Sequence, residues 1–387
     1  MTSGMSLRSN LSLVKHNAVI GAEIATEIMK MGKERKNNWT TSVPIDLAKP
    51  DKEKLNRIKE VTKVVDRKVI VVGASVIDVI ARSDQKIIMG TSNPGGYRES
   101  QGGVGRNIAE ALGRLGTKTV FYTAIGNDEK GTTLIENLET KYNILTKFIC
   151  TSDKTAFYFA ILNNNGELQT AIADMNVNEY IPSPTETELQ GAKMLVIDAN
   201  APISNLATAS LSAFKMNIPI FLETTSSPKA SLISESDILK TVTFVSPNYD
   251  ELFSLAQIED VKGKQLNLSD QLQRLKTDED LPIKLAASRV IGNMNPSHAH
   301  ILITLGEFGV LRVSRTTPSS CLKYIHYEAP KPKCVKNVTG AGDTFAAAFV
   351  HEFVQNQDVD TAILFALRAA KLSIECEHSA IPNLETL

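Results

Sequence analysis

The chain has 387 residues, and 42 Lys and Arg side chains nearly balance 43 Asp and Glu side chains, which leaves a formal net charge of −1. This balance disfavours a nucleic-acid-binding surface, and no apolar run approaches the ~18 residues that a membrane span requires. The four cysteines lie far apart without a CxxC pair, so neither a disulfide framework nor a zinc site is expected. The composition therefore predicts a cytoplasmic globular protein whose partners include neither nucleic acid nor a membrane.

The first part of the chain differs in pattern from the rest. Residues 16–31 carry apolar side chains at helical spacing. A polar segment with prolines and mixed charges follows, which is typical of a linker. From Arg67 onward the pattern changes to short apolar runs. We therefore expect residues 1–66 to form a helix plus linker and residues 67–387 to form one large domain.

Within that domain, short apolar runs alternate with helical segments. The segment 104–115 has apolar residues on one helical face, and the predicted strands are 68–73, 117–124, 193–198, 218–222, 242–246 and 301–305. Short strands that alternate with helices are typical of a mostly parallel sheet covered on both faces. The sequence therefore predicts an α/β fold with three layers.

One segment departs from this alternation. Residues 155–174 contain two alternating runs on either side of Asn163–Gly166, which is the pattern of a β-hairpin. A hairpin does not fit a parallel sheet. We expect it to form a small accessory sheet or lid, built from about 85–100 and from 154–174.

The most informative motif is a small-residue turn before a helix. Gly340, Ala341 and Gly342 precede a helix that begins near Asp343, as the fourfold spacing of phenylalanines from Phe345 indicates. Such a turn lets backbone N–H groups converge on an anion, and the helix end adds positive potential. A carboxylate at Asp343 is suited to accept a proton from a hydroxyl that attacks phosphorus. The same residues could instead cap the helix without any ligand.

Polar residues also follow two of the predicted strands. Asn248 and Glu251 follow the predicted strand 242–246, and Thr304 and Gly306 lie at the end of the predicted strand 301–305. Open α/β sheets bind ligands at the carboxyl ends of their strands, and Asn and Glu supply the oxygen atoms that Mg²⁺ prefers. The alternative for the first pair is a helix amino terminus with acidic residues, and for the second pair a tight turn.

A third group lies near the start of the domain. Asp78 follows the first predicted strand, and Gly102 and Gly103 precede the helix that contains Asn107. A carboxylate and an amide can bind vicinal hydroxyls, and paired glycines permit close approach of a ligand. Together these residues indicate a sugar site, although each alone could belong to a turn or a cap.

In this order, these motifs resemble those of the ribokinase-like (pfkB) carbohydrate kinases. The resemblance extends from Arg67 to the end of the chain and includes the segments 102–107, 125–131, 248–251, 304–309 and 338–345. It implies a ribokinase-like fold with a β lid, ATP and Mg²⁺ as cofactors, and a homodimer formed through the lid. It further implies that Asp343 is the base and that Gly340, Ala341 and Gly342 form the anion hole.

The remaining roles follow from the same resemblance. Asp78, Gly102, Gly103 and Asn107 would hold the sugar. Thr304 and Gly306 would contact the nucleotide, and Asn248 and Glu251 would hold Mg²⁺, mostly through water. Asn337 stands where most members of the family have Asp, so a potassium ion as a further cofactor is left open.

Within the family, the chain is most similar to the pseudouridine kinases. The similar segments are 92–95, 105–107, 171–175, 223–226 and 337–339. This branch implies phosphorylation of the 5′-hydroxyl of pseudouridine. Thr224 stands where Pro is expected, a departure that we interpret as affecting a structural turn. Residues 16–28 resemble the last helix of pseudouridine-5′-phosphate glycosidase, without the rest of that enzyme. The alternatives are another nucleoside or sugar kinase of the same fold and a catalytically inactive regulatory relative.

Overall fold

The computed structural model describes residues 68–151, 153–258, 268–317 and 320–376. The chain divides into two units, Met1–Glu60 and Val61–Leu387, and all described residues belong to the second. The helix and linker predicted for residues 1–66 lie outside the described residues.

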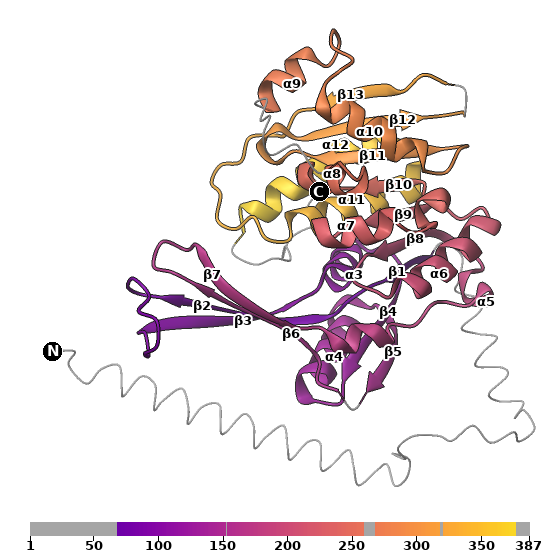
Figure 1. The fold of residues 1–387 in the computed structure, drawn as a ribbon. Coiled ribbons are helices and arrows are strands. Elements are labelled where there is room, and N and C mark those ends of the chain that lie inside the picture. Colours follow the sequence, from indigo (N-terminus) through magenta and orange to yellow (C-terminus); the bar gives the residue numbers. More distant parts are fainter. Residues whose placement is uncertain (1–67, 152, 259–267, 318–319, 377–387) are drawn as a thin grey trace, which may run out of the picture. The chain divides into compact units, whose positions relative to one another are not determined.

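A nine-stranded sheet forms the centre of the described unit (Figure 1). Its order is β13-β12-β11-β10-β9-β8-β1-β4-β5, and all neighbours from β11 to β5 are parallel. β12 and β13 add an antiparallel edge. The strands are β1 (Lys68–Val72), β4 (Thr119–Gly126), β5 (Leu145–Thr151), β8 (Ala192–Asp198), β9 (Ile220–Glu223), β10 (Phe244–Ser246), β11 (Ala299–Thr304), β12 (Val310–Arg315) and β13 (Lys323–Tyr327).

Helices cover both faces of this sheet. The α-helices are α3 (Val104–Arg114), α4 (Glu129–Tyr142), α5 (Glu186–Leu189), α6 (Ile203–Lys215), α7 (Ser227–Ser234), α8 (Tyr249–Leu255), α9 (Leu268–Arg274), α10 (Pro282–Gly292), α11 (Ala341–Asn356) and α12 (Val359–Ile374). The described residues also contain three short 3₁₀ segments, η1 (Asn176–Tyr180), η2 (Ile238–Thr241) and η3 (Gly306–Phe308). Among the described residues, no helix has the length and apolar character needed to cross a bilayer.

The side chains of β1 illustrate the three layers. Val69 and Val71 are fully buried in a cluster with residues of α3, α4, α11 and α12. Ile70 and Val72 are fully buried on the opposite face, with residues of α6, α7, α8 and α10. Both faces are apolar because each is packed against helices, which accounts for the uninterrupted apolar run in the sequence. The predicted three-layer α/β fold is confirmed.

A second sheet of four strands has the order β3-β2-β6-β7. Its strands are β2 (Val76–Ser83), β3 (Gly95–Gly102), β6 (Ala156–Leu162) and β7 (Leu168–Asp174). β6 and β7 are antiparallel and form the predicted hairpin, and we refer to the whole sheet as the lid. At its start the lid differs from the expected segment 85–100, because β2 begins at Val76 and that segment covers only part of β3.

β2 was missed because it follows β1 after only three residues. Gly73 makes this path feasible, since a Cβ there would lie 2.7 Å from Asp198 Cβ and 2.8 Å from Gly105 Cα. The chain therefore leaves the large sheet next to the start of α3 and enters the lid. As a consequence Asp78 lies within β2, and not in a turn beyond a strand as the sequence suggested.

Candidate active site

The amino terminus of α11 contains the predicted anion loop. Gly340 precedes the helix with a φ of 80°, a left-handed conformation that glycine adopts without steric cost. The helix begins at Ala341, slightly earlier than predicted, so Gly342 and Asp343 belong to its first turn. A Cβ at Gly342 would meet no atom within 4 Å. Gly342 therefore faces open space, and the first turn offers N–H groups and a positive helix end suited to a phosphate.

A hydrogen bond joins this turn to a distant part of the chain. Asn107 Nδ2 in α3 donates to Asp343 Oδ2 at 2.8 Å, across a separation of 236 residues. Asn107 is buried and Asp343 is half-buried. The sugar loop (residues 102–107) and the anion loop (residues 340–342), identified separately in the sequence, therefore meet at this bond.

The surroundings of Asp343 favour a proton acceptor that works near neutral pH. Burial raises the pKa of the Asp343 carboxyl to about 7, and the negative charges of Asp198 and Asp78 add to this effect. The hydrogen bond from Asn107 and the positive charge of Arg106 act in the opposite direction. A carboxylate with a pKa near the working pH is a stronger base than an ordinary aspartate and still ionises.

Asp78 lies against the glycines of the sugar loop. A Cβ at Gly102 would lie only 1.9 Å from Asp78 Oδ2, so a larger residue at this position would displace the Asp78 carboxyl group. Gly103, with a φ of 95°, precedes α3 and would clash with the Ala74 carbonyl if it had a Cβ. Burial raises the pKa of Asp78 to about 6, against the positive charge of Arg106. The carboxyl group is thus placed beside backbone that a small polar ligand could approach closely.

Asn248 and Glu251 form a capping box at the start of α8. Asn248 Oδ1 accepts from the Glu251 N–H, and Glu251 Oε2 accepts from the Asn248 N–H, each at 2.9 Å. Thr224 Oγ1 also donates to Glu251 Oε2 at 2.7 Å. Thr224 therefore contacts a side chain that the sequence assigns to Mg²⁺, in addition to its place in a structural turn.

Thr304 lies next to this capping box. The Thr304 N–H donates to the Pro247 carbonyl at 2.9 Å, and Thr304 forms a parallel β-bridge with Asn248. Gly306 has a φ of 59° and no atom within 4 Å of a Cβ position. The carboxyl ends of β10 and β11 therefore place the predicted metal and nucleotide residues side by side.

Two buried carboxylates connect these groups, and the sequence reading did not select either as a site residue. Asp198 ends β8 and accepts hydrogen bonds from Ala74 N, Gly105 N and Thr225 Oγ1 at 2.8–3.0 Å. Glu223 ends β9, and its pKa is raised well above the usual value by burial and by the negative charges of Asp343, Glu251 and Asp198. Each follows an apolar strand at the sheet edge, so the argument that identified Asn248 would have identified them too.

The donor atoms near Glu251 fit Mg²⁺ held through water. Carboxylate and amide oxygens are suitable ligands, but Asn248 Oδ1 and Glu251 Oε2 already accept backbone hydrogen bonds. In the described part of the chain, no group of three or more His, Cys, Asp and Glu side chains is placed to coordinate a metal directly. Mg²⁺ usually keeps several waters and binds substrate phosphates, so these residues fit the ion that accompanies a nucleotide.

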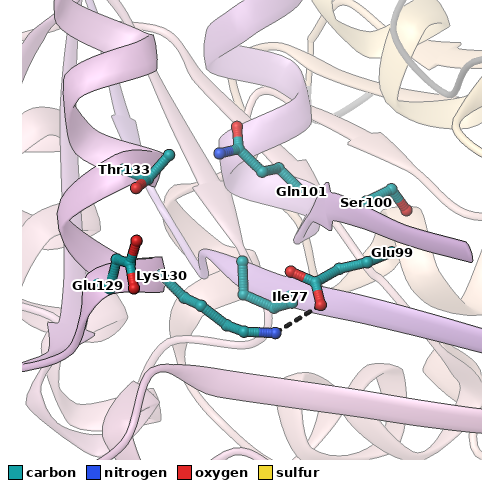
Figure 2. Close-up of a pocket in the computed structure, with 7 residues that line it drawn as sticks. All are labelled: Ile77, Glu99, Ser100, Gln101, Glu129, Lys130 and Thr133. Atoms are coloured by element: carbon teal, nitrogen blue, oxygen red, sulfur yellow. Dashed lines mark hydrogen bonds and ion pairs between the residues drawn. The ribbon is translucent and has the colours of Figure 1, made fainter. Parts of the chain in front are cut away.

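A pocket of about 400 Å³ lies where the lid meets α4 (Figure 2). Ile77, Glu99 and Gln101 line it from the lid, on the face opposite to Asp78 because neighbouring strand residues alternate in direction. Lys130 of α4 forms an ion pair with Glu99 at 2.5 Å across this junction. Ser100, which pairs with Asp78 of β2, also lines the pocket, so the pocket is not confined to the face opposite Asp78 and lies at the junction of the lid and α4.

Comparisons with known proteins agree with this geometry. Residues 66–387 match the model of the pfkB family of carbohydrate kinases. The chain is 29% identical over 322 residues to the pseudouridine kinase of Escherichia coli, which covers 82% of this chain and 93% of that protein. It is 26% identical over 440 residues to a pseudouridine-metabolizing bifunctional protein of Schizosaccharomyces pombe, covering 100% of this chain and 58% of that protein.

A solved structure shows the same fold. Arabidopsis thaliana ribokinase, complexed with ribose and ATP, superposes with a TM-score of 0.63 at 20% identity, covering 82% of this chain and 94% of that one. The ribokinase-like fold is thus confirmed. The chain belongs to the pfkB family of carbohydrate kinases.

Proposed function

We propose that this chain transfers the γ-phosphoryl group of ATP to the 5′-hydroxyl of pseudouridine, producing pseudouridine 5′-phosphate and ADP. The observation that carries the proposal is the 2.8 Å hydrogen bond between Asn107 and Asp343. It joins the side chain that we assign to the sugar to a carboxylate at a helix end suited to an anion. The similarity to the pseudouridine kinase of Escherichia coli over most of both chains supports the choice of nucleoside.

The residues then have distinct tasks. Asp78, Gly102, Gly103 and Asn107 hold the ribose, so that the 5′-hydroxyl points at Asp343. The Asp343 carboxylate takes the hydroxyl proton while the oxygen attacks the γ-phosphorus and the bond to the β-phosphate oxygen breaks. The N–H groups of Gly340, Ala341 and Gly342 stabilise the charge on the transferring group. Because phosphoryl transfer needs little covalent help from the protein, positioning and electrostatic stabilisation account for most of the rate.

ATP and Mg²⁺ are assigned to residues at the carboxyl ends of β10 and β11. Thr304 and Gly306 contact ATP, and Asn248 and Glu251 hold Mg²⁺ mostly through water. When bound, Mg²⁺ neutralises phosphate charge. That charge would otherwise be repelled by the carboxylates of Glu223, Glu251 and Asp343. A potassium requirement is a separate question, and it is tested by replacing K⁺ with Na⁺ in the same assay.

A panel of acceptors tests the proposal. ADP release is measured with pseudouridine, uridine, adenosine and ribose, each with and without Mg²⁺. We expect pseudouridine to give the highest kcat/KM, with activity only in the presence of Mg²⁺. The variant D343N should retain ATP binding and lose about 10²–10⁴-fold in kcat. If ribose or adenosine is preferred, the chain is another kinase of this family. If no acceptor supports turnover, it is an inactive relative.

The lid supplies a candidate surface for a homodimer. β3 and β7 are its edge strands, and large apolar side chains are exposed on them, including Tyr97 at 76% and Ile172 at 68%. We propose that two lids pair through this surface. Light scattering of the wild type and of I172D checks this, since the substitution should convert a dimer into a monomer.

The segment before the kinase domain is a separate proposal. The alignment with the Schizosaccharomyces pombe bifunctional protein covers the whole of this chain, including residues 1–66. This supports the view that the segment derives from the end of a glycosidase.

A further inference from the structure

Arg106 is a buried cation directly behind the sugar loop. Its side chain is only 6% exposed, and its guanidinium forms an ion pair with Glu110 one turn later in α3. Nη1 donates to the Gln101 carbonyl and Nη2 to Gln101 Oε1, each at 3.2 Å. Gln101 belongs to β3 of the lid, so this guanidinium is held from two sides, by α3 and by the lid.

The same guanidinium determines how the Asn107 amide is turned. Arg106 Nη1 donates to Asn107 Oδ1 at 3.1 Å, and Asn107 Nδ2 donates to Asp343 Oδ2 at 2.8 Å. A rotation of the amide by 180° would place its NH₂ group against the guanidinium and its oxygen against the carboxylate. Both contacts would then be repulsive. Only one orientation satisfies both neighbours.

We propose that Arg106 is a positioning residue that fixes the Asn107 amide as a hydrogen-bond donor to Asp343 and links the lid strand β3 to the base. This inference rests on the proposed function, because it takes Asp343 as the proton acceptor. It assigns Arg106 no contact with the nucleoside or with ATP. Arg106 acts through Asn107.

The electrostatics around Asp343 give the direction of the expected effect. The groups that act on Asp343 are Arg106 and Asn107 from α3, Asp78 from β2, Asp198 from β8 and Glu223 from β9. Arg106 is the cation among them, and with Asn107 it lowers the pKa of Asp343. Without Arg106 the carboxylate loses a nearby positive charge and an oriented donor. Its pKa should rise, and activity at low pH should fall.

The experiment compares R106M with a matched control on the same helix face. Arg114 also binds Glu110, with Arg114 Nε to Glu110 Oε1 at 2.8 Å, and its other partner is the Tyr142 hydroxyl and not Asn107. In R106M we expect kcat to fall about 10–100-fold, the size expected for a misplaced reacting group, with little change in the KM for ATP. The acidic limb of kcat/KM against pH should move to higher pH. R114M should lower the melting temperature without moving the limb.

A double-mutant cycle separates positioning from a general loss of structure. If Arg106 acts through Asn107, R106M should add almost nothing to the loss already caused by N107L. Full additivity of the two losses would overturn the inference, as would an unshifted limb in R106M. An equal shift in R114M would do the same.

Two further outcomes are informative. If R106M does not melt cooperatively, R106K takes its place, since it keeps the charge beside Glu110 but lacks the planar fork. An intermediate loss of kcat then supports the inference, and wild-type kinetics and pH dependence overturn it. A wild-type chain that phosphorylates a different acceptor overturns the proposed substrate only, because the comparison of variants can be made with that acceptor.

Discussion

Gly102 is the residue at which the sugar site is most sensitive to a single added carbon. A Cβ there would lie 1.9 Å from Asp78 Oδ2, and the carboxyl group must move to make room. We expect G102A to raise the KM for the nucleoside about 10–100-fold. This is the loss of affinity expected when one or two hydrogen bonds to a charged group are lost. The KM for ATP should change little. Steady-state kinetics with each substrate varied in turn measures both.

Gly96 provides the control for this substitution. It lies in the same strand, β3, and nothing lies within 4 Å of its Cβ position. G96A should therefore retain the wild-type KM values. If G96A and G102A raise the KM equally, the effect comes from the stiffness of the strand and the role of Asp78 is contradicted.

Single residues were predictable where their chemistry is local. Gly340 and Asp343 stand in one short motif, and the structure places them at a helix start as expected. Asp198 ends an apolar strand and could have been selected by the argument that selected Asn248, but its partners are set by the tertiary fold. Asp198 binds Ala74, which is 124 residues away in the sequence. A contact of that kind leaves no periodic pattern, and only an assembled fold reveals it.

At the scale of elements, α8 combines two tasks at its first turn. Glu251 caps the helix and is also the predicted carboxylate for Mg²⁺. In E251Q the amide oxygen can still accept the Asn248 N–H, so the cost in stability should stay below about 1 kcal/mol. The negative charge is lost, and the Mg²⁺ concentration for half-maximal activity should rise about 10-fold or more, as for other outer-shell groups. Activity measured against Mg²⁺ concentration checks this.

Helix α5 begins with the same kind of capping box as α8 but is not assigned to Mg²⁺. α5 begins with a capping box in which Thr185 and Glu188 have the roles of Asn248 and Glu251. E188Q should change stability by a similar amount and leave the Mg²⁺ dependence at its wild-type value. Equal Mg²⁺ dependence in E188Q and E251Q would mean that Glu251 only caps its helix.

In the large sheet, the success of strand prediction followed burial, whereas in the lid the exposed strand β7 was predicted from its alternating pattern and β2, with four buried residues, was missed. β1, β8 and β11 were predicted because both faces of these strands are covered, which makes them continuous apolar runs. The edge strand β13 has no fully buried residue, and β3 has only Gly102. Such strands resemble loops in sequence, since their pairing depends on neighbours rather than on their own hydrophobicity. The structure therefore adds an antiparallel edge and half of the lid to the predicted fold.

At the scale of the whole chain, the second unit contains every residue of the proposed site. The unit spans Val61–Leu387, and the site residues extend from Asp78 to Asp343. We expect the fragment 61–387 to fold and to retain the kcat and KM of the full chain within about twofold. Expression of the fragment beside the full chain tests this. A large loss of activity would assign residues 1–60 a part in catalysis.

The pH dependence of stability follows from the half-buried carboxyl group of Asp343. Asp343 has a pKa of about 7 in the folded protein, above its usual value of 3.8. Between about pH 4 and pH 7 the folded state therefore binds more protons than the unfolded state, and stability falls as the pH rises through this range. D343N removes this contribution. The variant should gain stability relative to the wild type above pH 7, by about 4 kcal/mol at most, and the difference should vanish near pH 4.

Calorimetric melting of both proteins between pH 4.5 and pH 8.5 measures this difference, with D358N as a control of opposite sign. Hydrogen bonds from Thr361 lower the pKa of Asp358. The ionised form of Asp358 thus stabilises the folded state above its usual pKa, and the stabilisation is lost as the pH falls. D358N should accordingly be neutral or destabilised at high pH. A D343N advantage that is the same at both ends of the range would contradict a raised pKa at Asp343 and, with it, the proposal that this carboxylate is tuned as a base.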